Sequence, residues 1–265
     1  MKVIKTRTVA VAAALVMALT FASCSNSSDD SAALLALASS SGSSVPTTAS
    51  SAHMKAEAVA EGIKFTLKGG FVASDGYVFV QQVGDVNRFI PDWGTKSEDW
   101  TGVYPFVTAG KVYKFMIWGT GNKTEELTVK AIGGSGDIKN GSNASVSLQI
   151  TPQKITATTN DLDPALIFPA GATNKKVYMP VQAGEYPNGA FVKDWIVTTV
   201  LDGANATYEL PASEQLYTDL KTAFTTTHTG KKAHIEFAFS FTIAGFAAEC
   251  HSTTVRSPAV LGIWE

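Results

Sequence analysis

The sequence predicts a mainly β protein with two β-sandwich-like domains, the second of which carries one α-helix. Many short segments alternate apolar and polar residues, as half-buried strands do, and turns rich in glycine or asparagine separate them. One later segment instead repeats its apolar residues at the helical period. The length beyond residue 58 is enough for one large domain or two smaller ones.

The N-terminal residues have the pattern of an export signal. Three basic residues within the first seven positions precede an apolar run of 13 residues, 9–21, which is too short to span a membrane as a helix. The junction at residues 21–24 (FASC) resembles the lipobox of bacterial lipoproteins, in which the signal peptidase cuts before a lipidated cysteine. The resemblance implies a signal peptide over 1–23 and a palmitate-type lipid on Cys24 that anchors the mature chain to a membrane. Ser25 then indicates the outer membrane of the bacterial cell envelope, and the alternative is an ordinary signal peptide with an incidental cysteine.

Residues 24–57 are dominated by Ser, Ala and Thr and predict a flexible tether. Such a segment buries too little apolar surface to offset the entropy lost on ordering. A chain of this length has a reach of roughly 30 Å, so it would hold the folded part clear of the membrane.

The first folded domain is predicted over residues 58–143. Its strands are expected at 63–67, 77–80, 103–107, 112–117 and 127–131, with a long irregular stretch over 84–102. The segment 106–115 (FVTAGKVYKF) resembles the loop and strand of fibronectin type III and related immunoglobulin-like domains. That resemblance implies an immunoglobulin-like sandwich, with Tyr113 as a corner tyrosine that bonds back to the backbone. The fold itself serves many unrelated functions.

The second domain is predicted over residues 144–265. Its strands are expected at 146–150, 177–179, 195–201, 234–243 and 246–255. A helix is expected near 213–225, with Ser213 as its N-cap. A two-residue turn at 244–245 would pair Phe239 with Cys250 and bury the thiol in the sheet.

Charge and cysteine content exclude several classes of partner. Without the signal peptide the chain has 18 basic and 23 acidic residues, a net charge of −5, and it has no basic face for nucleic acid. With Cys24 lipidated, Cys250 is the one remaining cysteine and forms no intrachain disulfide. No phosphate-binding loop or nucleophile motif is present, so no cofactor or catalytic residue is assigned.

Two groups of polar residues contain side chains that could bind a metal ion. His234, Glu236, Glu249 and His251 share one face of the predicted hairpin, and a solvated strand face with charges is the preferred interpretation because ligand spacing is missing. Asp161 and Asp163 precede Pro164, and a turn explains them better than a calcium loop.

Trp93 and Trp100 are the candidate ligand-binding residues, because they lie in a long polar loop beside carboxylates and amides. Tryptophan rings can stack on a sugar or anchor a protein contact, and the alternative is that both rings pack back onto the sandwich. The sequence therefore predicts a membrane-anchored envelope lipoprotein with a binding or adhesion role toward a protein or glycan. A carbohydrate-binding protein and an unrecognised hydrolase are the alternatives.

Overall fold

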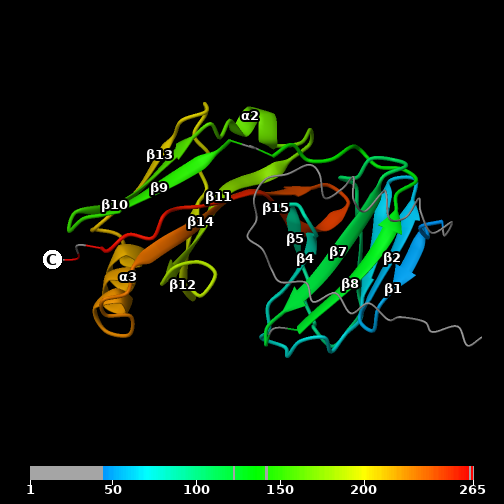
Figure 1. Ribbon diagram of the computed structural model, residues 1–265, viewed down its shortest axis with the longest axis horizontal. Coiled ribbons are helices and arrows are strands. Elements are labelled where there is room, and N and C mark those ends of the chain that lie inside the picture. Colours follow the sequence, from blue (N-terminus) through cyan, green and yellow to red (C-terminus); the bar gives the residue numbers. More distant parts are fainter. Residues whose placement is uncertain (1–43, 122, 141–142, 263, 265) are drawn as a thin grey trace, which may run out of the picture.

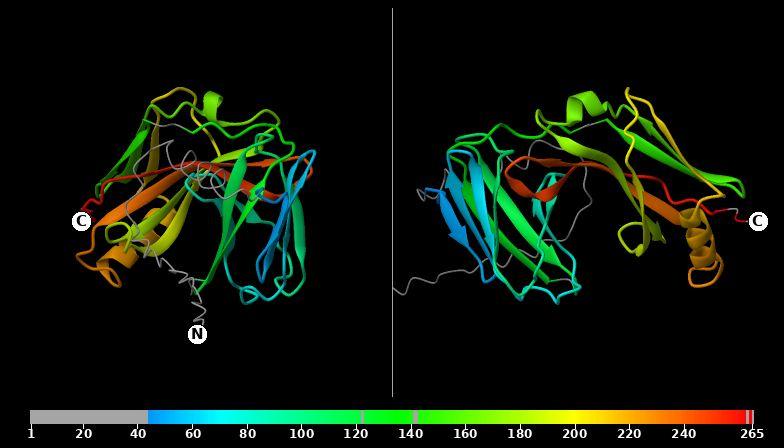
Figure 2. Two further views of the ribbon diagram at one scale, coloured as in Figure 1. Left: turned by 45° about the vertical axis from the view of Figure 1, so that its right-hand side comes forward. Right: turned by 180° about the vertical axis from the view of Figure 1, so that it is seen from behind.

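The computed structural model describes residues 44–121, 123–140, 143–262 and 264, so Cys24 and the lipobox-like segment lie outside the described residues. Within that part, the chain forms three antiparallel sheets and two helices, which confirms the predicted mainly β fold. An eight-stranded sheet runs through the molecule, and two smaller sheets lie at its two ends (Figure 1). Figure 2 shows from two further sides that the two ends are joined by long strands of the large sheet.

The strands are ordered differently in space and along the chain. The four-stranded sheet has the order β1 (Thr48–Ser50), β2 (Met54–Val59), β3 (Gly62–Leu67) and β6 (Trp100–Tyr104). The three-stranded sheet has the order β13 (Thr207–Pro211), β10 (Lys154–Asn160) and β9 (Ser145–Ile150). The eight-stranded sheet has the order β12 (Ala190–Val197), β11 (Thr173–Ala183), β14 (Ala233–Ile243), β15 (Phe246–Arg256), β5 (Arg88–Pro91), β4 (Val78–Gln82), β7 (Val112–Gly119) and β8 (Lys123–Lys130).

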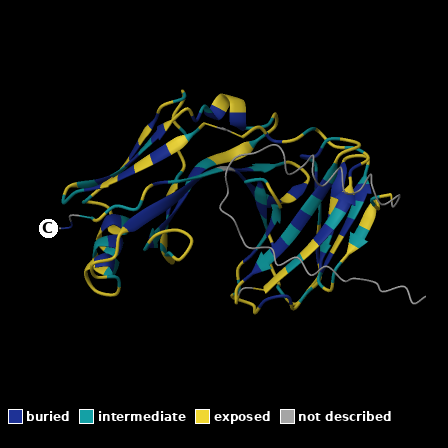
Figure 3. Cartoon of the chain, viewed as in Figure 1, coloured by how far each residue is buried: buried dark blue, intermediate teal, exposed yellow. Residues whose placement is uncertain are grey.

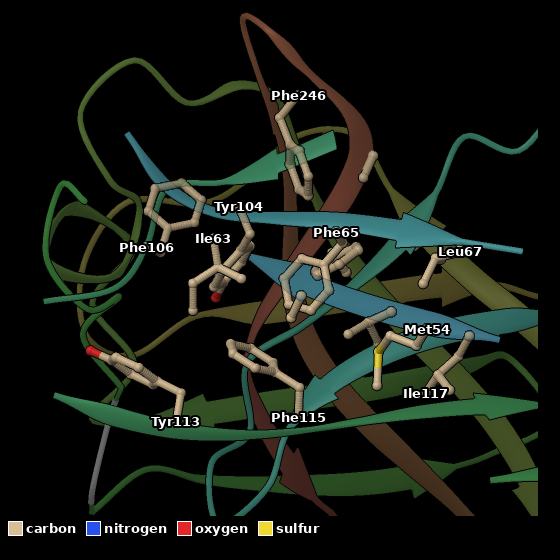
Figure 4. Close-up of a cluster of buried hydrophobic side chains, with 14 of the residues drawn as sticks. Met54, Ile63, Phe65, Leu67, Tyr104, Phe106, Tyr113, Phe115, Ile117 and Phe246 are labelled. Atoms are coloured by element: carbon tan, nitrogen blue, oxygen red, sulfur yellow. The ribbon is translucent and has the colours of Figure 1, made fainter. Parts of the chain in front are cut away.

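A first hydrophobic core lies between the four-stranded sheet and one end of the large sheet. Phe65 of β3 packs edge-on against Phe115 of β7, with ring centroids 4.9 Å apart (Figure 4). Phe246 of β15 contributes to the same core and packs edge-on against Phe89 of β5, with centroids 5.0 Å apart. The alternation of buried and exposed positions along these strands explains why one face of each enters the core.

A second hydrophobic core lies between the three-stranded sheet and the other end of the large sheet. Helix α3 (Gln215–Thr225) contributes Tyr217, Leu220 and Phe224, as its helical periodicity predicts. The helix begins at Gln215, and Glu214 occupies the N-cap position without a side-chain hydrogen bond, so the predicted cap by Ser213 is wrong.

A second, very short helix, α2 (Pro164–Ile167), follows the aspartates that a calcium loop would use. Asp163 caps this helix, because its carboxylate accepts a hydrogen bond from the backbone N–H of Ala165 at 3.0 Å. Asp161 has a φ of 58°, which a turn residue tolerates. The preferred turn interpretation of these residues therefore agrees with the local geometry.

The β14–β15 hairpin belongs to both cores. Phe237 and Phe239 of β14 enter the second core, whereas Phe241 of the same strand face enters the first. Both small sheets therefore cover the same face of the eight-stranded sheet. In Figure 3, β14 is coloured as buried along most of its length, between one core and the other.

The register of this hairpin differs from the prediction beyond its turn. Ile243 pairs with Phe246 as expected, but Phe241, not Phe239, is opposite Cys250. An irregularity between Phe241 and Ile243 shifts the pairing, since a bulge places extra residues on one strand. Cys250 is nevertheless fully buried as predicted, and burial raises the pKa of its thiol.

The folded part starts earlier in the chain than its composition indicates. Strand β1 and the first four residues of β2 lie within the segment that the composition predicts to be a tether. Met54 and Ala56 point into the first core, and His53 bonds to Glu125 of β8 through Nδ1 at 2.6 Å. Alanine, lysine and glutamate are poor strand formers. Strand β2 is therefore stabilised mainly by the burial of its alternate apolar side chains in the core.

Tyr113 was expected to be a corner tyrosine. The hydroxyl of Tyr113 accepts a hydrogen bond from the backbone N–H of Thr108 at 2.6 Å, so the expected bond to the backbone is present.

Neither of the helices in the described part of the chain has the length and apolar character needed to cross a membrane.

Candidate binding face of the eight-stranded sheet

Trp93 and Trp100, the candidates from the sequence, are both buried. Trp93 is 5% exposed, and its indole N–H donates to the carbonyl of Glu98 at 2.7 Å. Trp100 is 6% exposed and donates to the carbonyl of Ala247 at 3.2 Å. Each ring has its polar atom satisfied inside the protein and offers little face to a ligand. Their burial favours the packing alternative over sugar or protein contact.

A hollow of about 240 Å³ lies beside this loop. Small or polar residues line it, namely Gly70, Val72, Ser74 and residues 94–97, and neither tryptophan is among them. A ligand site usually combines apolar walls with a few convergent polar groups, which this hollow lacks.

The polar face of the β14–β15 hairpin is not a solvated strand face, and that interpretation of the sequence is wrong. His234 is 1% exposed, His251 is fully buried and Glu236 is 9% exposed. The hairpin lies in the middle of the sheet, between β11 and β5, so long side chains from both neighbours cover it. No group of three or more metal-ligating side chains occurs in the described residues.

We define the open face as the face of the eight-stranded sheet opposite to the two cores. Directly paired residues of antiparallel strands point to the same face, so the strand register identifies its residues. One row crosses seven strands, and its members are Glu126, Met116, Gln81, Arg88, His251, Ser240 and Lys176. Among the described elements, neither small sheet covers this row. The open face therefore collects polar side chains from both halves of the chain.

Ion pairs hold the middle of the open face together. Glu236 accepts a hydrogen bond from Nε of Arg256 at 3.0 Å and lies 3.9 Å from a guanidinium nitrogen of Arg88. Glu249 bonds to the ammonium group of Lys176 at 2.9 Å and to Nε2 of His251 at 3.1 Å. Pairing offsets the loss of hydration that these partly buried charges undergo on folding.

The pKa shifts in this cluster follow from those contacts. The hydrogen bond from His251 is the largest of the effects that lower the pKa of Glu249 to about 2, and Lys176 adds to it. Burial lowers the pKa of His251, so its imidazole is neutral and Nε2 carries the proton that Glu249 accepts. Nδ1 of His251 is then an acceptor, and it has no hydrogen-bond partner among the described residues.

Three aromatic residues, which we call the aromatic trio, lie on the same face at one end. Phe79 of β4 and Trp118 of β7 are directly paired and stacked, with ring centroids 5.2 Å apart. Tyr77 packs edge-on against both rings and is 38% exposed. The guanidinium of Arg88 lies over the Phe79 ring, 5.5 Å from its centroid, and so connects the trio to the ion pairs.

Carboxylate and phenol groups from distant strands influence one another across the open face. Asp194 lies on β12, and Tyr77 comes directly before β4, which four strands separate from β12 in the sheet. The carboxylate of Asp194 contributes to raising the pKa of Tyr77, after the larger effect of burial. Tyr178 of β11 lies between them, and its phenol interacts with both Asp194 and Tyr77.

Several buried polar atoms on this face lack a partner within the described chain. Besides Nδ1 of His251, they include Nε of Arg88 and one carboxylate oxygen of Asp194. Asp194 is partly buried, and this burial raises the pKa of its carboxyl group. Buried polar groups are usually satisfied, so unsatisfied groups gathered in one place are typical of a site that takes a ligand.

The sequence identified only part of this face. It placed His234, Glu236, Glu249 and His251 together, but it did not connect them to Arg88, which lies in the predicted irregular stretch. The alternation of Tyr77 and Phe79 with Val78 and Val80 could have indicated the aromatic part of this face. It gives this strand two apolar faces, and only one of them is needed for a core.

Comparisons with known proteins give little further information. No family model matches the chain, and no curated protein matches it. A solved structure of a DUF3823 family protein from Bacteroides ovatus is 15% identical, with a TM-score of 0.25. The match covers 70% of this chain and 90% of the other.

Proposed function

We propose that this chain is a lipid-anchored protein of the bacterial cell envelope that binds a ligand on the open face of its eight-stranded sheet. The observation that carries the proposal is the gathering of half-exposed aromatic rings, paired charges and unpartnered buried polar atoms on one face. The lipobox-like junction before Cys24 supports the anchor.

A binding role fits this face better than catalysis does. Glu249 is held ionised by two partners, and a carboxylate with a pKa of about 2 is a weak general base at neutral pH. Glu236 is engaged by two arginines. Asp194 is the one carboxyl group here with a raised pKa, so a matched acid and base pair for hydrolysis is not evident among the described residues.

Anchoring depends on one residue, which makes it directly testable. In a bacterial host, we expect the wild-type chain to incorporate labelled palmitate and to sediment with membranes. Cys24→Ser should incorporate no palmitate and should keep its signal peptide, because cleavage follows lipidation of the cysteine. A Cys24→Ser chain that still incorporates palmitate, or a wild-type chain that incorporates none, would contradict the lipid anchor.

Ligand binding by the open face is tested with Asp194→Asn. The full lipidated chain, in a detergent without a sugar headgroup, is titrated calorimetrically with neutral oligosaccharides, acidic oligosaccharides and peptides. We expect at least one class to bind, and Asp194→Asn to weaken that binding about tenfold, because hydrogen bonds to charged groups are worth about 1.5–3 kcal/mol.

The matched control for this experiment is Asp202→Asn, which makes the same change at an exposed loop position outside the sheet. It should bind like the wild type. The proposal is wrong if no probe binds, or if both variants bind as tightly as the wild type.

A further inference from the structure

We infer that the ligand of the open face is a neutral oligosaccharide that stacks on the aromatic trio and is hydrogen-bonded by the charged side chains beside it. This inference rests on the proposed function. It is carried by the balance of charge on the face, by the aromatic rings and by the position of the central charged groups on inner strands of the sheet.

The charges at the centre of the open face are balanced. Arg88, Arg256 and Lys176 are matched by Glu236, Glu249 and Asp194, and the first five of these groups are held in ion pairs on the face itself. A charged ligand would have to displace one of these partners and leave its charge unpaired in a partly buried place. A ligand without charge but rich in hydroxyl groups can bond to the remaining hydrogen-bonding positions of the half-exposed Lys176, Glu249 and Arg256 and leave the ion pairs intact.

The aromatic trio offers ring faces to a ligand. Trp118 and Phe79 are only partly buried, and Tyr77 is 38% exposed, although strand side chains of this type are usually covered. The trio lies directly beside Arg88, so apolar ring faces and hydrogen-bonding groups are adjacent. Sugars present the same combination, with an apolar C–H face and a rim of hydroxyl groups.

The central charged groups lie away from the sheet edges at which an extended peptide usually binds. The large sheet ends at β12 and β8, whereas Arg88, Glu236 and Glu249 lie on inner strands whose backbone groups pair with a strand on each side. A flat protein partner is also disfavoured, because the core of a protein interface is depleted of charged residues and this face has charges at its centre.

Tryptophan fluorescence isolates one member of the trio. The chain has five tryptophans, of which Trp93, Trp100, Trp195 and Trp264 are buried, whereas Trp118 is partly exposed. A neutral quencher such as acrylamide therefore acts mainly on Trp118. We expect a neutral hexasaccharide from a panel of cello-, xylo-, manno-, malto- and chito-oligosaccharides to reduce this quenching.

Variants then test whether the contact is a stacking contact. Measured by calorimetry on the full chain, Trp118→Ala should weaken oligosaccharide binding at least tenfold, whereas Trp118→Phe should restore part of the affinity. Tyr77→Ala should weaken binding less, because Tyr77 lies at the edge of the trio. Leu166→Ala, at a position that is 62% exposed on α2, is the control and should bind like the wild type. Thermal unfolding of each variant shows whether the chain is folded.

The outcomes separate this inference from the proposed function. If only acidic oligosaccharides or peptides bind, and Asp194→Asn weakens them, the face is a binding site but the neutral glycan is wrong. If neutral oligosaccharides bind equally well to Trp118→Ala, Tyr77→Ala and the wild type, stacking on the trio is wrong. If no probe of any class binds, both the inference and the proposed function fail.

Discussion

Replacing Phe241 by alanine should lower the free energy of unfolding by about 3–5 kcal/mol, the range measured for large aromatic-to-alanine changes in protein cores. Phe241 is fully buried and packs edge-on against Phe106 of the first core, with centroids 5.8 Å apart. It also packs against Phe168, which contacts both cores, at the same centroid distance of 5.8 Å. Urea unfolding followed by circular dichroism measures the loss.

The control for this substitution is Phe191→Ala on β12, where the same side chain is 61% exposed. It should change stability by no more than about 0.5 kcal/mol, as surface substitutions usually do. Since Phe241 lies where the two cores meet, its loss should lower the stability of both together, so a single transition is expected. A loss below about 1 kcal/mol would mean that the hairpin does not join the two cores.

Acid should destabilise the protein through the open face in two stages. In the folded chain the pKa of His251 is below its ordinary value of 6.5. As the pH falls below 6.5, His251 therefore binds a proton in the unfolded chain before it does so in the folded chain. The free energy of unfolding falls as a result. Glu249 has a pKa of about 2 in the folded chain against 4.5 ordinarily. Its contribution is therefore complete above pH 4.5 and is lost as the pH falls toward 2. We expect this second stage to remove about 2 kcal/mol.

Glu249→Gln should flatten the second stage, because glutamine does not titrate. Urea unfolding at a series of pH values from 7 to 3 measures the slope. The matched control is Glu209→Gln, which makes the same change in an ion pair with Lys154 whose two side chains are 46% and 44% exposed. Such exposed pairs contribute little, so the control should keep the wild-type slope. An unchanged slope in Glu249→Gln would show that another group governs acid unfolding.

The sequence predicted the strands with strong alternation and missed those without it. Strand β14 has phenylalanine at alternate positions, so its two faces are plain from the pattern. Strand β5 has only four residues and ends at Pro91, which resembles a loop. Strand β2 alternates alanine with lysine and glutamate, and only its partners in space show that the alanines are buried.

The candidate site was harder to predict than the fold. His251 and Glu236 were placed on one face by periodicity, but their burial depends on Arg88 and Tyr178, which come from strands far away in the chain. Trp93 and Trp100 lie in a segment with the composition of a binding loop, yet Trp100 begins strand β6 and both rings are buried. Local patterns report which residues share a face, and they do not report what covers that face.

The shared hairpin also dictates an order of assembly. The first core takes Phe241, Phe246, Ala248 and Cys250 from β14 and β15, which are made long after the other strands that surround it. A chain still emerging from the ribosome lacks these side chains, so its N-terminal half has an open core and an unpaired edge at β5. Pairing that is so distant in sequence closes slowly. The protein therefore becomes resistant to proteases only after its last strand has arrived, and both halves reach that state together.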